Sequence, residues 1–125
     1  MSFVFNPLTG QLDRVRKGTT GSSPWTTFTE TAIASTTTAL DTISVGTFNT
    51  IKYSLSIVDN TNNQTATLET IVKNANGVID NTVGHQMKGG ISYKLSAVND
   101  AGDFKLNLEN NEATDLTVNI AKIII

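Results

Sequence analysis

The fold class of this 125-residue chain is decided by residues 51–57, which read Ile-Lys-Tyr-Ser-Leu-Ser-Ile. Apolar residues alternate here with Lys or Ser, and a period of two places the apolar set on one face of a β-strand. The alternation recurs, with varying regularity, at residues 66–73, 91–97, 104–109 and 116–120, and weaker strand signals lie at 27–35, 42–45 and 77–83. The chain is therefore predicted to consist of short strands, each with one apolar and one polar face.

Turn residues separate the predicted strands. Asn76-Gly77 suits a type I′ hairpin, which needs a positive φ at both central residues. Residues 59–63, 88–90, 99–103 and 110–112 are rich in Asn, Asp and Gly and are predicted to be loops. This strand length and turn spacing predict an all-β fold, an antiparallel β-sandwich of jelly-roll or Ig-like type.

Composition excludes several classes of protein. The chain has no cysteine, which removes disulfide scaffolds, thiolate zinc sites and cysteine nucleophiles. No apolar run approaches the roughly 18–20 residues that cross a bilayer, so no membrane contact is expected. The formal net charge is −2 and the few aromatic residues are dispersed, so direct nucleic-acid binding is not expected either.

The chain divides into an extended N-terminal arm and linker, residues 1–24, and a β-sandwich domain, residues 25–125. The arm carries Arg14, Arg16 and Lys17 against Asp13, whereas the remainder has six basic and ten acidic residues. Residues 18–24 read Gly-Thr-Thr-Gly-Ser-Ser-Pro and have no periodicity, which is typical of a linker. The basic cluster suits contact with phosphates or with an acidic protein groove, and a solvated tail explains it equally well.

No constellation of catalytic or metal-ligating residues emerges. His85 is the only histidine, and the residues around it supply no orienting carboxylate or nucleophile. Residues 59–63 superficially resemble a calcium loop, but the twelfth position holds Thr70 in place of Glu. We therefore expect no catalytic residue, no metal, no cofactor and no enzymatic activity.

Both ends of the chain carry apolar residues that need a partner. Phe3, Phe5 and Leu8 lie in the arm, and Asn6-Pro7 favours a turn between them. They are expected to bury against the sandwich, a neighbouring copy or another protein. At the other end, the last strand has apolar residues on both faces, which predicts an oligomer interface at Ile123, Ile124 and Ile125.

These ends also carry a family resemblance. Residues 5–13, Phe-Asn-Pro-Leu-Thr-Gly-Gln-Leu-Asp, resemble the F-N-P-x-T-G-x-L-D segment near the start of many tailed-phage virion proteins. Residues 41–59, with Asp41-Thr42 before a turn and Lys52-Tyr53 in the strand, resemble the first long strand of a small β-sandwich common in phage structural proteins. Residues 67–74 and 117–124 fit the same layout, with Lys122 where that family usually has Arg.

The resemblance implies a non-enzymatic virion component, made in the host cytoplasm and carried on the phage particle. An arm and one sandwich suit a capsid decoration (cement) protein that binds the major capsid protein, with a homotrimer as the expected oligomer. The partner-binding residues would then be Phe3, Phe5, Asn6, Pro7, Leu8, Arg14, Arg16 and Lys17.

Two alternatives stay open. The first is a tail or baseplate accessory protein that attaches fibres, with the same arm docking onto a tail ring. The second is a carbohydrate-binding sandwich that aids host adsorption through stacking aromatics, of which Trp25, Tyr53 and Tyr93 are available. Tyr53 and Tyr93 fall on predicted inner faces, which counts against this second alternative.

Overall fold

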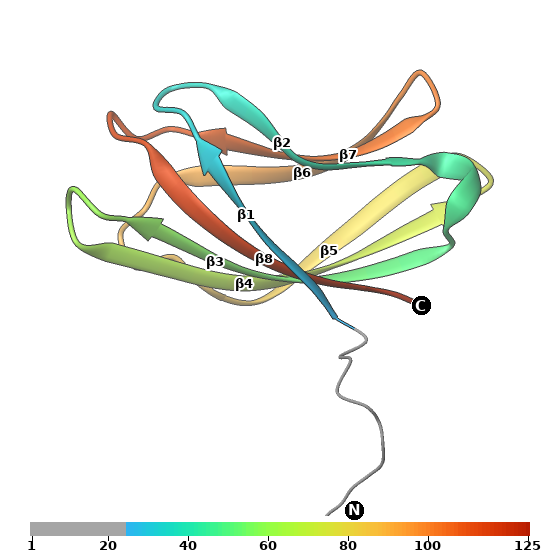
Figure 1. Ribbon diagram of the computed structural model, residues 1–125, viewed down its shortest axis with the longest axis horizontal. Helices are drawn as coiled ribbons and strands as arrows, with labels where there is room; N and C mark the ends of the chain where they lie inside the picture. Colours follow the sequence, from blue (N-terminus) through green and yellow to red (C-terminus); the bar gives the residue numbers. More distant parts are fainter. Residues whose placement is uncertain (1–24) are drawn as a thin grey trace, which may run out of the picture.

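The computed structural model describes residues 25–125, which form two antiparallel sheets packed against each other (Figure 1). The predicted all-β sandwich is therefore confirmed. The strands are β1 (Thr26–Ala32), β2 (Thr37–Ser44), β3 (Thr50–Asp59), β4 (Gln64–Ala75), β5 (Val78–Met87), β6 (Tyr93–Asp100), β7 (Asp103–Asn110) and β8 (Leu116–Ile124). A single 3-10 turn, η1 (Val45–Thr47), links β2 to β3.

The strand order brings the two ends of the described chain together, because the first strand pairs with the last. The five-stranded sheet has the order β1-β8-β3-β4-β5 and the three-stranded sheet has the order β2-β7-β6. Pairing of β1 with β8 and of β2 with β7 is the nested arrangement of a jelly roll. In an Ig-like sandwich the first two strands are neighbours in one sheet, whereas here they lie in different sheets. The meander β3-β4-β5 within one sheet completes the topology.

The core lies between the sheets and follows the predicted alternation. Every second residue of β3, from Ile51 to Asp59, is buried. The opposite sheet contributes Phe104, whose ring packs edge-on against Phe48 with 5.3 Å between ring centroids and lies 6.3 Å from the Tyr53 ring. Each fully buried side chain of this kind stabilises the fold by roughly 1.5–3 kcal/mol.

The weaker strand signals located the strands correctly but not their ends. β2 begins at Thr37, well before the predicted residue 42, and β5 continues to Met87 beyond the predicted residue 83. In contrast, β1 ends at Ala32, short of the predicted residue 35, and β6 begins only at Tyr93. β5 was underestimated because it is an edge strand with a β-bulge, so neither of its faces reads as a clean apolar row.

The predicted hairpin turn at Asn76-Gly77 is confirmed, since both residues have a positive φ, 57° and 91°. The β6–β7 hairpin uses the same geometry at Ala101 and Gly102. These two-residue turns match the twist of the strands they join, and so they set the register of both hairpins.

The predicted arm, residues 1–24, lies outside the described residues, so its boundary with the sandwich stays a prediction. The described chain enters the sandwich beside its own C-terminal strand. Thr26, the first residue of β1, pairs with Lys122 near the end of β8.

Candidate functional site

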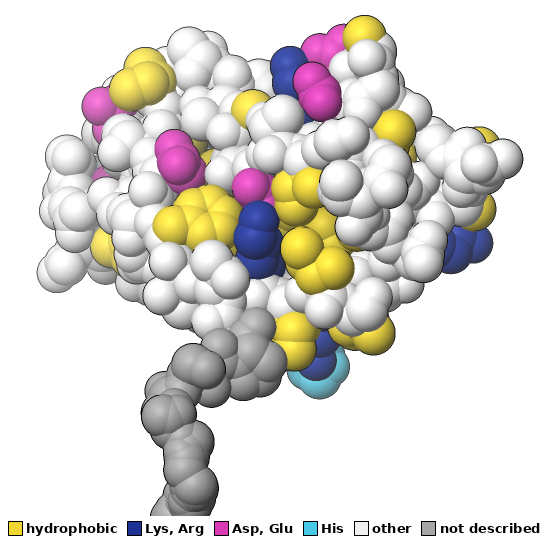
Figure 2. Space-filling model, turned by 45° about the vertical axis from the view of Figure 1, so that its right-hand side comes forward, with side chains coloured by type: hydrophobic (Ala, Val, Ile, Leu, Met, Phe, Trp, Pro, Cys, Tyr) yellow, Lys and Arg dark blue, Asp and Glu magenta, His cyan; other side chains and the backbone are white. Residues whose placement is uncertain are grey.

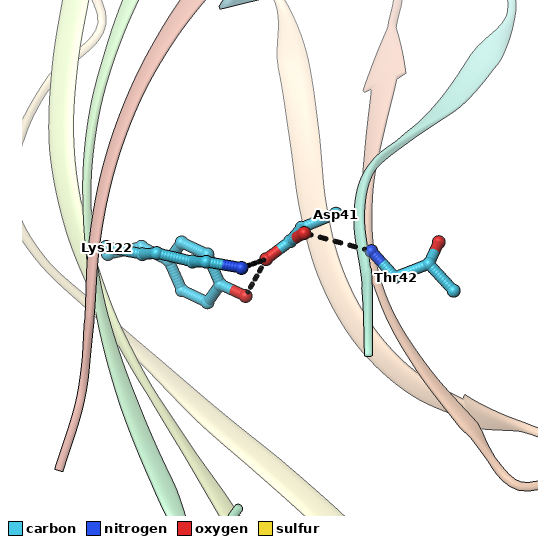
Figure 3. A network of polar contacts seen from close by, with 4 residues as sticks. Asp41, Thr42 and Lys122 are labelled. Carbon is cyan, nitrogen blue, oxygen red and sulfur yellow. Dashed lines mark hydrogen bonds and ion pairs between the residues drawn. The ribbon is translucent and has the colours of Figure 1, made fainter. Parts of the chain in front are cut away.

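A polar network joins the two sheets at the open edge between β1 and β2 (Figure 3). Asp41 of β2 accepts hydrogen bonds on Oδ2 from Tyr53 Oη of β3 at 2.7 Å and from Lys122 Nζ of β8 at 2.9 Å. Its other oxygen, Oδ1, accepts from the main-chain N of Thr42 at 3.1 Å. We call Asp41, Tyr53 and Lys122 the intersheet network, because one carboxylate on the smaller sheet holds two side chains of the larger sheet.

Strand pairing brings the members of the network together. Tyr53 and Lys122 are direct partners in the antiparallel ladder between β3 and β8. Asp41 lies next to a register shift in β2, between Ala39 and Asp41, and this bulge bends the strand locally. All three positions had been singled out in the sequence as parts of the phage-like pattern, but nothing in the sequence indicated that they touch.

The charges of the intersheet network balance each other, because Asp41 and Lys122 form an ion pair. The side chains of Asp41 and Lys122 are only 13% and 16% exposed, and each carries the charge that the other needs. Burial, together with the Asp41 carboxylate, raises the pKa of Tyr53, so its hydroxyl stays protonated and acts as a donor. Both oxygens of Asp41 accept hydrogen bonds within the protein, so the arrangement acts as a structural clamp between the sheets.

Lys122 also marks a partly apolar surface at this edge. Its Nζ lies 5.6 Å from the centroid of the half-buried Phe28 ring, within cation–π range. A shallow depression of about 340 Å³ separates β1 from β2 here, and both residues line it. Figure 2 shows apolar side chains on both sides of a lysine and an acidic side chain on the face turned to the reader.

The predicted oligomer interface lies at the end of β8. Ile123 is half-buried, whereas Ile124 and Ile125 are 51% and 73% exposed. Ile124 pairs with Ile51, and the main-chain N of Ile125 donates to the carbonyl of Thr50 at 2.9 Å. The backbone of this apolar end is therefore held to β3 while its side chains remain open to solvent.

The remaining predicted partner-binding residues, Phe3, Phe5, Asn6, Pro7, Leu8, Arg14, Arg16 and Lys17, all lie outside the described residues. Their roles therefore stay predictions.

The aromatic residues weighed for glycan stacking are placed by the structure. Tyr53 and Tyr93 are buried on inner faces, as predicted. Trp25 is half-buried just before β1. His85 is exposed on the edge strand β5 and lies in the left-handed region with a φ of 51°.

Asp59 takes part in a turn, and its oxygens are used within the protein. Asn62 Nδ2 donates to it at 2.8 Å, the main-chain N of Thr61 at 3.1 Å and Thr114 Oγ1 at 3.0 Å. These bonds, that of Asn62 foremost, hold the pKa of Asp59 below its usual range. Among residues 25–125, no group of three or more His, Asp or Glu side chains could hold a metal ion.

Two features carried no signal in the sequence. The first is an apolar edge on β5, where Val78, Val83 and Met87 are exposed. The second is a hollow on the outer face of the five-stranded sheet, lined by polar side chains from all five strands. Both depend on which strands become neighbours, and alternation within one strand does not reveal that. Within residues 25–125, no helix has the length and apolar character needed to cross a membrane.

No protein-family model matches the sequence, and neither does any curated protein. Among solved structures, the chain resembles the tailspike protein of Acinetobacter phage vB_ApiP_P1 with a TM-score of 0.45 and 6% sequence identity. The likeness covers 92% of this chain and 25% of the tailspike chain, so the chain spans about a quarter of the tailspike. A likeness this distant carries no argument about function.

Proposed function

We propose that the chain is a structural component of a tailed-phage virion, and that it decorates the assembled head as a cement protein. The proposal is carried by the segment Phe-Asn-Pro-Leu-Thr-Gly-Gln-Leu-Asp at residues 5–13, together with the phage-like strand pattern of residues 41–59. The structure supports it by giving that pattern a physical role. Asp41 and Tyr53, which lie in that strand pattern, form the clamp between the sheets together with Lys122.

The charge distribution supports docking through the arm. Residues 25–125 carry ten acidic and six basic residues, whereas Arg14, Arg16 and Lys17 concentrate basic charge before the linker. β1 begins beside the end of β8, where Ile124 and Ile125 are exposed. An apolar end of β8 beside the start of β1, with a basic arm preceding β1 in the sequence, suits simultaneous contact with a neighbouring copy and with a capsid subunit.

The mechanism is stabilisation by mass action. A partner that binds only the assembled shell shifts the equilibrium toward that shell. In a trimer, three arms would bind together, and their avidity would compensate for weak individual contacts. The major capsid protein is the proposed partner.

The decisive experiment counts copies of this protein in purified virions by quantitative mass spectrometry. Decoration of the head requires hundreds of copies, on the scale of the capsid lattice. A handful of copies would contradict decoration and favour the tail or baseplate alternative, and absence from virions would contradict both.

Docking through the arm is tested separately with heads that lack the protein. Full-length protein should cosediment with these heads, and the double variant Phe5→Ala/Leu8→Ala should not. Ser22→Ala in the linker is the control and should bind normally. Equal binding of the double variant would refute the role of the arm.

The trimer is tested by light scattering of the Ile125→Asp variant. Ile33→Asp is a matched control, because Ile33 is also an exposed isoleucine, at 50%, but lies between β1 and β2. We expect Ile125→Asp to dissociate the oligomer and Ile33→Asp to leave it intact. A monomeric full-length chain, or two variants of equal size, would refute the interface.

A further inference from the structure

The outer face of the five-stranded sheet has a hollow of about 680 Å³ at its centre. All five strands line it, from Thr27 and Thr29 on β1 to His85 on β5. The volume lies within the roughly 300–1,000 Å³ typical of small-ligand sites.

The hollow arises because small side chains meet in the middle of the sheet. Ser56 pairs with Asn119 on one side and Thr67 on the other, and Ser54 pairs with Ala121 and Glu69. One register step away the side chains are larger, since Lys52 pairs with Ile71 and Ile123. The small central rows therefore form a floor with a higher wall on one side.

The floor has hydrogen-bonding capacity that the protein does not use. Within residues 25–125 the hydroxyls of Thr27, Ser54, Ser56 and Thr67 have no hydrogen-bond partner. Asn119 accepts a hydrogen bond on Oδ1 from Thr29 at 3.0 Å, which leaves its amide protons free to donate. A ligand in the hollow would meet groups that both donate and accept.

One rim of the hollow carries a strained residue. β5 has one residue more than β4 between the pairs Glu69–Gly84 and Thr67–Met87, and His85 lies in this bulge. Its φ of 51° is unfavourable for a residue with a side chain. Bulges and such strain concentrate where a side chain is aimed at a site.

The charge of the lining limits the ligand. Among residues 25–125, Glu69 is the one carboxylate that lines the hollow, the Lys52 ammonium lies 4.0 Å from it, and no Lys or Arg belongs to the lining. A polyanion such as nucleic acid would find no counter-charge there. An extended peptide would need free main-chain groups, but β8, β3 and β4 are each paired on both sides.

We propose that this hollow binds a neutral oligosaccharide. Sugar hydroxyls both donate and accept hydrogen bonds, as do the serine and threonine hydroxyls of the floor. Asn119, Glu69 and His85 supply the remaining polar contacts. Binding rests mainly on hydrogen bonds, because among the described residues the hollow is lined by no Trp or Tyr and by one Phe, Phe28, which is half-buried. This inference goes beyond the proposed head decoration and does not depend on it.

The test is a glycan array that carries neutral glucans, galactans and mannans beside sialylated and sulfated glycans. The array is probed with the full chain. The best neutral oligosaccharide is then titrated in solution by calorimetry. We expect neutral probes to bind and acidic probes to be rejected. Absence of neutral binding by the folded chain, or binding of acidic glycans alone, would overturn the proposal.

Two variants locate the binding site. Ser56→Phe fills the floor and should abolish binding, while Asn119→Ala should weaken it about tenfold. Thr31→Phe, on the same face of β1 but outside the hollow, is the control and should bind as the parent chain does.

Urea unfolding and light scattering accompany each variant. Normal glycan binding by a folded Ser56→Phe would refute the hollow as the site. A changed oligomeric state in Ser56→Phe would show instead that a second copy covers this face.

Discussion

The Tyr53 hydroxyl donates a hydrogen bond across the sandwich to Asp41, with 2.7 Å between Oη and Oδ2. The two residues are twelve positions apart in the chain but belong to different sheets. Apolar packing between the sheets has little directional preference, whereas this hydrogen bond forms only when the Asp41 carboxylate lies opposite Tyr53 on β3. It therefore helps to set how the two sheets lie on each other.

Tyr53→Phe should destabilise the protein by about 2 kcal/mol, since it removes a hydrogen bond to a charged group and leaves a gap beside Asp41. Urea unfolding at neutral pH measures the change as a lower midpoint with an unchanged slope. An unchanged midpoint would show that the bond contributes nothing net.

Tyr93→Phe should be neutral or stabilising by up to about 1 kcal/mol, and it serves as the matched control. Among the described residues, the Tyr93 hydroxyl is the one buried side-chain polar atom without a hydrogen-bond partner. The Lys88 ammonium lies 4.9 Å from the ring centroid, and phenylalanine would keep that contact. A clear loss of stability in the same urea experiment would contradict the structure around β6.

Lys122→Met should cost about 3 kcal/mol, because it leaves the poorly exposed Asp41 carboxylate without its counter-charge. Asp41→Asn in the same chain should recover part of that loss, since the asparagine still accepts from Tyr53. A double-variant cycle in urea measures the recovery. Strictly additive costs would mean that Asp41 and Lys122 are not coupled.

Lys105→Met is the exposed counterpart of this change. Lys105 pairs with Asp100 at 2.8 Å, but the Asp100 side chain is 59% exposed. Solvent screens this pair, so its loss should cost far less than that of Lys122.

Asp59 should make stability fall in acid. Its folded pKa is lowered by the hydrogen bonds it accepts, that of Asn62 foremost, so it lies below the unfolded value of about 3.9. The contribution of the carboxylate is therefore fully present above about pH 4 and is lost as the pH falls through the folded pKa. Asp59→Asn should lower stability at neutral pH and flatten the acid limb of a stability–pH curve. An equally steep acid limb would assign the effect to other carboxylates.

Gly89→Ala should be more damaging than Gly102→Ala. Both glycines have a positive φ, 57° and 96°, so alanine is strained at either position, by about 1–2 kcal/mol. At Gly89 a Cβ would also overlap the carbonyl oxygen of Thr65, whereas no atom lies near it at Gly102. Thermal unfolding of both variants compares them, and equal losses would exclude the steric contribution.

Prediction from the sequence succeeded where one strand face is buried. The alternation of residues 51–57 became the buried and half-buried alternation of β3, and Asn76-Gly77 formed the expected turn. Both are local patterns, set by the pleat of the strand and by the φ of two residues. Prediction was weaker for β5, because an edge strand has less to bury and because the bulge at His85 shifts its alternation.

The candidate sites also differ in whether the sequence reveals them. The apolar residues at the chain ends were evident from the sequence, but the intersheet network and the hollow were not. The phage-like pattern singles out Asp41, Tyr53 and Lys122 but does not indicate that they touch, and Ser54, Ser56 and Thr67 read as ordinary polar residues of an outer face.

By itself, the sequence determined the strands, their buried faces and most of their turns, because alternation and turn chemistry act between residues that are near in the chain. The tertiary structure alone decided that β8 inserts between β1 and β3 and that β2 pairs with β7. That choice depends on contacts between residues far apart in the chain, which no local pattern encodes. It places Lys122 beside Tyr53, brings Asp41 across to both, and sets the small side chains of four strands side by side to form the hollow.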